Sequence, residues 1–107
     1  MGIARSPACR TSPINFAASG DNTIIAAVTA APIKVYGLFF TVAGATNITF
    51  KDGTTALSGP IVFTNNGSSQ QLNLWEEPWF YCQPGDAFVM NNSNAVQVSG
   101  IIYYTQP

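Results

Sequence analysis

The feature that most limits how this chain can fold is the regular spacing of turn residues between short apolar runs. Residues 47–51 alternate strictly between polar and apolar side chains, and Asp52-Gly53, a pair typical of tight hairpin turns, follows at once. Further turns are predicted at Gly20-Asp21, at residues 65–67 and at residues 84–86. Since no segment repeats apolar residues at helical spacing, the pattern predicts an all-β protein with short strands.

Two segments, residues 33–42 and 96–104, are the longest apolar stretches, and both are rich in β-branched and aromatic residues. Successive side chains of a strand point to opposite faces, and in these two segments both faces are apolar. This predicts central strands that are covered on both sides. Shorter strands are predicted at residues 22–28, 47–51, 54–57, 61–63, 70–75, 79–81 and 87–90. About eight short strands separated by turns are typical of an antiparallel β-sandwich of the jelly-roll type.

The length of 107 residues favours a single domain with one core. The first 13 residues differ from the rest, because they contain two of the four cations, Arg5 and Arg10, together with prolines and no alternation. We therefore predict an N-terminal arm over residues 1–13 and a β-sandwich over residues 14–107. A segment without its own core is expected to become ordered against a partner.

Charged residues make up only 8% of the chain, and the net charge is −1. The surface is then built largely from uncharged polar side chains, which cost little free energy to desolvate against another protein. Four cations leave no basic stripe, so neither nucleic acid nor an anionic membrane is an expected partner. The first residues lack the apolar segment of a secretory signal, so we expect synthesis in a cytoplasm, with Cys9 and Cys82 as reduced thiols.

The residue types needed for catalysis are sparse. The sequence has no histidine, which removes the commonest general base, the usual zinc ligand and the usual partner of a nucleophilic serine or cysteine. Three of the five acids each lie beside a glycine in a predicted turn. Glu76 and Glu77 are adjacent, so on an extended chain they point to opposite faces instead of facing each other across a substrate. We expect no enzymatic activity, no metal and no cofactor.

Residues 74–82 hold both tryptophans, Trp75 and Trp79, with Glu76 and Glu77 between them. Side chains two residues apart on a strand share a face, so if Leu72 and Leu74 point into the core, an unbroken strand would also force Glu76 inward. A bend is therefore predicted near residue 76. We expect one tryptophan to close the end of the sandwich and the other to lie at a protein contact, where tryptophan is a common anchor. In the alternative interpretation, Trp75, Trp79 and Tyr81 stack on sugar rings.

Several motifs occur in a fixed order. After the strand predicted from residue 33, residues 43–60 read A-G-A-T-N-I-T-F-K-D-G-T-T-A-L-S-G-P. Three further motifs follow: the Trp79-Phe80 pair, the turn at residues 84–86, and N-A-V-Q-V-S-G at residues 94–100. In these motifs the chain resembles a group of short all-β virion proteins of tailed bacteriophages, over roughly residues 23–104. The resemblance implies either a head decoration (cement) protein or a small tail-associated protein, and it implies no catalytic residues.

We therefore expect a decoration protein on the outer surface of the capsid, bound to the major capsid protein and stabilising the head. Such a protein would be made in the cytoplasm of the bacterial host and would form a closed homo-oligomer, a trimer in preference to a dimer. The alternatives are a receptor- or glycan-binding module of the tail and a structural tail or neck protein. The residues expected to contact partners are Arg5 and Arg10 in the arm, Trp75, Glu76, Glu77 and Trp79 at the bend, and Tyr36 and Phe40 between subunits.

Overall fold

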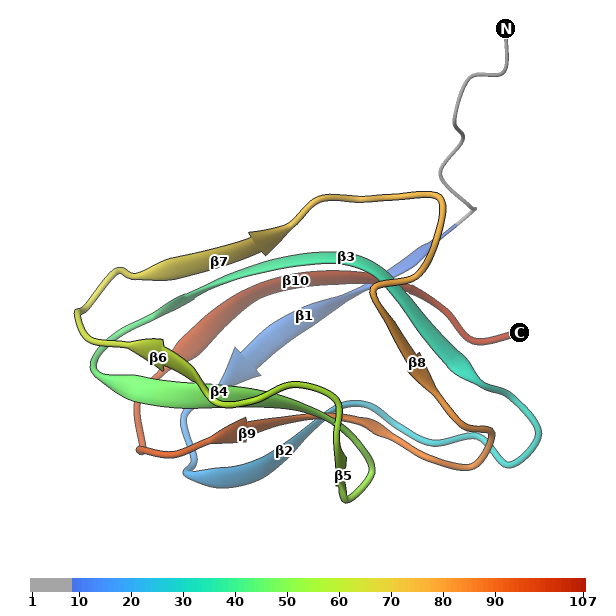
Figure 1. Ribbon diagram of the computed structural model, residues 1–107, viewed down its shortest axis with the longest axis horizontal. Helices are drawn as coiled ribbons and strands as arrows, with labels where there is room; N and C mark the ends of the chain where they lie inside the picture. Colours follow the sequence, from blue (N-terminus) through green and yellow to red (C-terminus); the bar gives the residue numbers. More distant parts are fainter. Residues whose placement is uncertain (1–8) are drawn as a thin grey trace, which may run out of the picture.

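The computed structural model describes residues 9–107, which form two antiparallel β-sheets packed face to face, without a helix (Figure 1). The first sheet has the order β1-β10-β3-β7, with β8 also paired to β3; the second has the order β2-β9-β4-β5, with β6 also paired to β4. The predicted all-β sandwich is confirmed. The strands are β1 (Arg10–Phe16), β2 (Gly20–Ile25), β3 (Ile33–Val42), β4 (Thr46–Asp52), β5 (Thr55–Ala56), β6 (Ile61–Phe63), β7 (Ser69–Leu72), β8 (Phe80–Cys82), β9 (Phe88–Asn92) and β10 (Val98–Thr105).

The strand pairing follows a jelly roll. β1 pairs with β10, β2 with β9, β3 with β7 and β8, and β4 with β5 and β6, so successive pairs alternate between the two sheets. β5 and β6 share one edge of their sheet, and β7 and β8 share one edge of the other. Ten short strands therefore fill eight strand positions, which agrees with the eight or so predicted from the spacing of turns.

Three of the four predicted turns are present, whereas Gly20 and Asp21 lie within β2 and form no turn. Asp52 and Thr55 are paired across the β4–β5 hairpin, and Gly53 has a φ of 58°, a left-handed backbone conformation that glycine adopts without steric cost. The turns at residues 65–67 and 84–86 also contain a glycine with positive φ, as does Gly20 at the start of β2. The β4–β5 turn folds one strand back on its neighbour, whereas the turns at residues 65–67 and 84–86 carry the chain from one sheet to the other.

A β-bulge in β3 overturns one prediction. The register with β10 pairs Tyr103 with Gly37 and Tyr104 with Val35, so Tyr36 is the extra residue. A bulge shifts the alternation by one residue, so odd-numbered side chains face the core before it and even-numbered ones after it. The buried side chains on the two sides of the bulge are Ile33, Val35, Leu38, Phe40 and Val42. Apolar residues at both alternating positions thus reflect a change of face, and the outer face of β3 is exposed at Phe39 and Thr41.

The core lies between the sheets and is rich in phenylalanine. The ring of Phe40 on β3 lies 6.1 Å from that of Phe50 on β4 and 5.5 Å from that of Phe63 on β6, both with edge-to-face geometry. Phe40 is fully buried, and Tyr36 exposes only 8% of its surface. The expectation that Phe40 contacts another subunit is therefore wrong, because the bulge turns Phe40 inward, whereas Tyr36 keeps a small exposed area and its predicted contact stays a prediction.

The N-terminal arm was also predicted too long. β1 pairs with β10 from Arg10 opposite Tyr104 onward, and Ile14 is buried in the core. Pro13 is compatible with this strand because β1 lies at the edge of its sheet, where one side makes no ladder hydrogen bonds. Arg10 thus belongs to the sandwich and is exposed at its surface, while Arg5 and the rest of residues 1–8 lie outside the described residues.

Candidate interaction site

A loop at the edge of the first sheet carries both tryptophans. Residues 73–79, called the Trp loop below, separate β7 from β8, and both of these strands pair with β3. Regular pairing stops at Leu72 and resumes at Phe80, so the predicted bend near residue 76 is confirmed, although the strand ends earlier than expected.

The Trp loop is attached to the backbone of β3 at two points. The backbone N–H of Trp75 donates to the carbonyl of Tyr36 at 3.1 Å, and that of Trp79 donates to the carbonyl of Val35 at 2.7 Å. A Cβ atom on Gly37 would lie 3.0 Å from backbone atoms of Leu74, so the glycine lets the loop lie close against β3. The loop is therefore held in one position before any partner binds.

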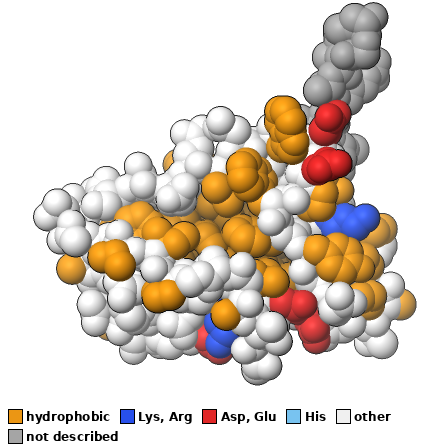
Figure 2. Space-filling model, viewed as in Figure 1, with side chains coloured by type: hydrophobic (Ala, Val, Ile, Leu, Met, Phe, Trp, Pro, Cys, Tyr) orange, Lys and Arg blue, Asp and Glu red, His pale blue; other side chains and the backbone are white. Residues whose placement is uncertain are grey.

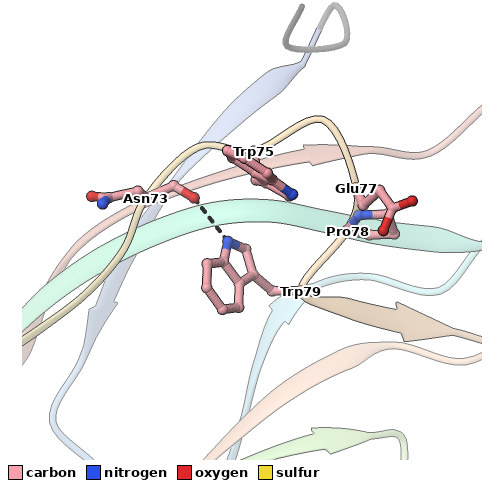
Figure 3. A pocket seen from close by; sticks show the side chains of 5 residues that line it. All are labelled: Asn73, Trp75, Glu77, Pro78 and Trp79. Carbon is pink, nitrogen blue, oxygen red and sulfur yellow. Dashed lines mark hydrogen bonds between the residues drawn. The ribbon is translucent and has the colours of Figure 1, made fainter. Parts of the chain in front are cut away.

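The Trp loop surrounds an open concavity of about 420 Å³ (Figure 3). Its lining residues are Asn73, Trp75, Glu77, Pro78 and Trp79. The Trp79 indole Nε1–H donates to the backbone carbonyl of Asn73 at 2.8 Å, which fixes the orientation of this ring. The side chain of Asn73 points away from the indoles, and its Oδ1 accepts a hydrogen bond from Gln71 Nε2 at 3.0 Å.

Neither tryptophan closes the end of the sandwich, contrary to prediction. Trp75 exposes 54% of its surface and Trp79 exposes 49%. The corresponding part of the core is filled by Phe80, whose ring lies 4.8 Å from that of Phe50 and 5.8 Å from that of Phe88. Leu74 is also exposed, so it does not point inward as expected. Two large aromatic side chains thus remain available on a loop of fixed shape.

The Trp loop is acidic. Glu76 and Glu77 are both exposed, and Glu77 lines the concavity. Among residues 9–107 the single salt bridge joins Lys51 to Asp21 at 2.9 Å, on the other sheet. Within that part of the chain, no cation is paired with either glutamate.

The structure brings together only some of the predicted contact residues. Trp75, Glu77 and Trp79 line one concavity, with Glu76 beside them in the chain. Arg10 begins β1, and Tyr81 lies on β8 opposite Lys34, outside the concavity. Asn73 and Pro78 also line the concavity and were not predicted from the sequence. The position of Pro78 within the predicted bend was the one signal that could have indicated it.

A second apolar surface adjoins the Trp loop. A hollow of about 270 Å³ is lined by Leu38, Phe39, Gln71, Leu72, Asn73, Leu74 and Tyr103. Phe39 exposes 46% of its surface on the outer face of β3, in register with Ile101 of β10. Figure 2 shows hydrophobic side chains gathered across the middle of the face that carries β6, β7 and β8, where charged side chains are few. The two hollows share Asn73, so the second, uncharged hollow adjoins the acidic concavity of the Trp loop.

A cluster of titratable groups lies elsewhere, where the β4–β5 turn meets the segment after β8. Asp52 Oδ2 accepts a hydrogen bond from the Gln83 backbone N–H at 3.2 Å. Burial raises the pKa of Asp52, and the nearby Asp86 carboxyl raises it further. Burial, with these two carboxylates, raises the pKa of the Cys82 thiol to about 12, so the thiol is protonated and unreactive at neutral pH. In the described part of the chain no three potential metal ligands of the His, Cys, Asp and Glu types come together.

Replacing Asp52 by asparagine is expected to raise the free energy of unfolding at pH 7, by less than about 1 kcal/mol because the site is partly exposed. A carboxyl with a raised pKa in the folded state costs stability once it ionises, so the gain should shrink as the pH falls through that pKa. Urea denaturation of Asp52→Asn and the unchanged protein between pH 7 and pH 3 measures the difference.

Asp21→Asn is the matched control, with the opposite expected sign. Hydrogen bonds from Asn91 and Lys51 lower the pKa of Asp21, so its charge stabilises the fold at neutral pH. The variant should lose stability at pH 7, again by less than about 1 kcal/mol, and the loss should vanish as the pH falls through the lowered pKa. If both variants change stability in the same direction at pH 7, the assigned environments are wrong.

Comparison with known proteins leaves the fold and the site to be interpreted from their own geometry. No protein-family model matches the chain, and no curated protein or solved structure matches it either. Within residues 9–107, no helix exists with the length and apolar character needed to cross a bilayer.

Proposed function

We propose that the chain is a bacteriophage head decoration protein, which binds the outer surface of the major capsid protein lattice and stabilises the head. The observation that carries the proposal is the Trp loop, where two half-exposed indoles are held by backbone hydrogen bonds on a jelly-roll scaffold. A site fixed before binding loses little conformational entropy when it docks, and tryptophan is among the commonest anchors of protein interfaces. The resemblance to short virion proteins in residues 43–60 and 94–100 supports the same function.

The proposed work of this protein is adhesion, and no catalytic step is assigned to it. A capsid filled with DNA is under outward pressure, so a protein that bridges neighbouring capsid subunits adds contacts that must break before the lattice opens. A surface with few charges forms such contacts at a small desolvation cost. Many copies on one lattice make individually weak contacts effective through multivalency.

The proposal includes a closed homo-oligomer on the virion surface, a trimer in preference to a dimer. Phe39, in place of the buried Phe40, is the aromatic side chain that β3 offers to a neighbouring copy. It forms part of a row with Ile101 and Pro13 across the outer face of the first sheet. Sedimentation velocity of the isolated chain measures this state directly.

Changing both tryptophans to alanine should weaken the affinity for undecorated heads at least tenfold, which corresponds to about 1.4 kcal/mol at 25 °C and appears as a tenfold lower occupancy below saturation. Both side chains are half-exposed and support no part of the core, so the fold should be retained. The test mixes the purified chain with heads built from the capsid protein of the phage that encodes it, and it counts bound copies after sedimentation. Val62→Ala is the control, because Val62 is 65% exposed on β6 of the other sheet. Equal loss in the control, or no loss in the double variant, contradicts the proposed surface.

A second candidate is a tail-associated receptor- or glycan-binding module. The open concavity between two exposed indoles favours it, since sugar rings stack on such faces. Immunogold labelling of whole particles, combined with a glycan array, distinguishes the two functions. Labelling over the whole head supports decoration, whereas labelling confined to the tail together with a saccharide hit supports the second candidate.

A further inference from the structure

The concavity of the Trp loop combines aromatic faces with negative charge. Trp75 and Trp79 expose about half of their surfaces there, and the Glu77 carboxylate lies at its rim beside Pro78 (Figure 3). The face of an indole carries negative electrostatic potential, so it attracts cations. Glu77 also lines this concavity and adds a formal negative charge at its edge. The local field therefore favours a positively charged ligand group.

The hydrogen-bonding groups in the concavity point to the same ligand. The Asn73 side chain, the one amide among the lining residues, extends away from the indoles, and its oxygen is already used by Gln71. The Trp79 N–H is used by the Asn73 carbonyl. A pyranose presents several hydroxyl groups that need both donors and acceptors, and this concavity offers them few. Of the two indole donors only the Trp75 N–H is left without a hydrogen bond among the described residues, and a cation needs only acceptors and aromatic faces, which Glu77 and the two rings supply.

The described chain has no cation of its own at this place. Lys51 is engaged by Asp21 and Arg10 begins β1, while Lys34 lies next to Val35, which binds the Trp loop, but does not line the concavity. Glu77 thus has an exposed charge that a partner can complement.

We infer that the concavity binds a cationic side chain, arginine before lysine, which projects from the surface of the partner protein. An arginine guanidinium is planar, so it stacks on an indole while its N–H groups donate to the Glu77 carboxylate. This inference rests on the proposed function only in taking the partner to be a protein. The inference states which chemical group of the partner the concavity recognises. Binding of that group can be measured with a small peptide, without the partner.

The test is a titration of the whole chain with the peptide acetyl-Gly-Arg-Gly-amide, followed by the two indole N–H signals in NMR spectra. Both signals should shift with millimolar affinity, and added salt should weaken the binding. The peptide with citrulline in place of arginine has nearly the same shape without the charge, and it should bind at least fivefold more weakly. Glu77→Gln should reduce affinity for the arginine peptide at least fivefold.

Glu76→Gln is the matched control, because Glu76 is the adjacent exposed carboxylate and does not line the concavity. It should change the affinity less than twofold. The inference is overturned if citrulline binds as well as arginine, if Glu77→Gln has no larger effect than Glu76→Gln, or if neither indole signal shifts at millimolar peptide. Shifts caused by neutral monosaccharides and insensitive to salt also overturn it, in favour of glycan binding.

The outcomes on heads separate this inference from the proposed function. If the arginine peptide binds as described but the chain does not bind heads, the cation site stands and the decoration function fails. If heads bind the chain with equal occupancy before and after Glu77→Gln, the decoration function stands and the cation site fails.

Discussion

Phe40→Ala is expected to lower the free energy of unfolding by about 3–5 kcal/mol, the range measured when a buried phenylalanine is truncated. Phe40 is fully buried between the sheets, and its ring contacts Phe50 and Phe63 on the opposite sheet. Truncation removes apolar contacts and leaves a cavity that a close-packed aromatic core fills only in part. Urea denaturation at fixed pH, followed by tryptophan fluorescence, measures the loss.

Phe39→Ala is the control, since it makes the same substitution one residue earlier on the same strand. Phe39 is 46% exposed on the outer face, so its truncation should cost less than about 1 kcal/mol. The pair also tests the bulge at Tyr36, because that bulge decides which of the two phenylalanines faces the core. A larger loss for Phe39→Ala than for Phe40→Ala would mean that the assignment of faces is reversed.

The parts of the fold that depend on local sequence were predictable. The alternation in residues 47–51 and the Asp52-Gly53 turn define the β4–β5 hairpin, because side-chain alternation and turn geometry are properties of a few consecutive residues. Gly67 and Gly85 act in the same local way in the turns at residues 65–67 and 84–86. The jelly-roll order was predictable from the number of such strands and their spacing, and the structure has that order.

The faces of β3 were not predictable, because they depend on a bulge against β10, a strand about sixty residues further along the chain. A bulge inserts one unpaired residue, and nothing in residues 33–42 alone marks Tyr36 as that residue. The extent of β1 was missed for a related reason. Residues 10–13 have no apolar alternation, and they become a strand only because β10 offers them an edge to pair with.

The candidate site was predicted in part. The crowding of Trp75, Glu77 and Trp79 around a proline indicated a bent, exposed segment, and these three residues do line one concavity. Which ring lies where depends on hydrogen bonds to the carbonyls of Val35 and Tyr36, on a strand that the segment meets only in the folded state. The core position expected for one tryptophan is taken by Phe80, because the chain re-enters regular pairing one residue after Trp79.

Asn92 is the centre of a buried polar network in the second sheet. Its side chain is fully buried, and Oδ1 accepts a hydrogen bond from the Thr46 hydroxyl. Its Nδ2 donates to the carbonyls of Val96 at 3.1 Å and Ala18 at 3.3 Å. Thr46 in turn accepts from the Asn94 backbone N–H at 3.1 Å. One amide thus satisfies groups from β4 and from the segments that flank β2 and β10.

Asn92→Leu is expected to lower the free energy of unfolding by about 2–4 kcal/mol, because it leaves buried partners without hydrogen bonds and each such group costs about 1–3 kcal/mol. Leucine is similar in size to asparagine, so the loss reflects polar groups more than an empty cavity. Asn91→Leu is the control: Asn91 is partly exposed and bonds Asp21 at the surface, so the change should cost at most about 1 kcal/mol.

A double-mutant cycle with Thr46→Val separates the hydrogen bond from general packing. Once Asn92 is leucine, the Thr46 hydroxyl has lost its acceptor, so Thr46→Val should cost about 1 kcal/mol less in that background than in the unchanged protein. Denaturation of the four proteins under identical conditions provides the coupling free energy. Additive losses would show that Thr46 and Asn92 contribute independently, and the network would then not be the reason why two polar side chains are retained in an otherwise apolar core.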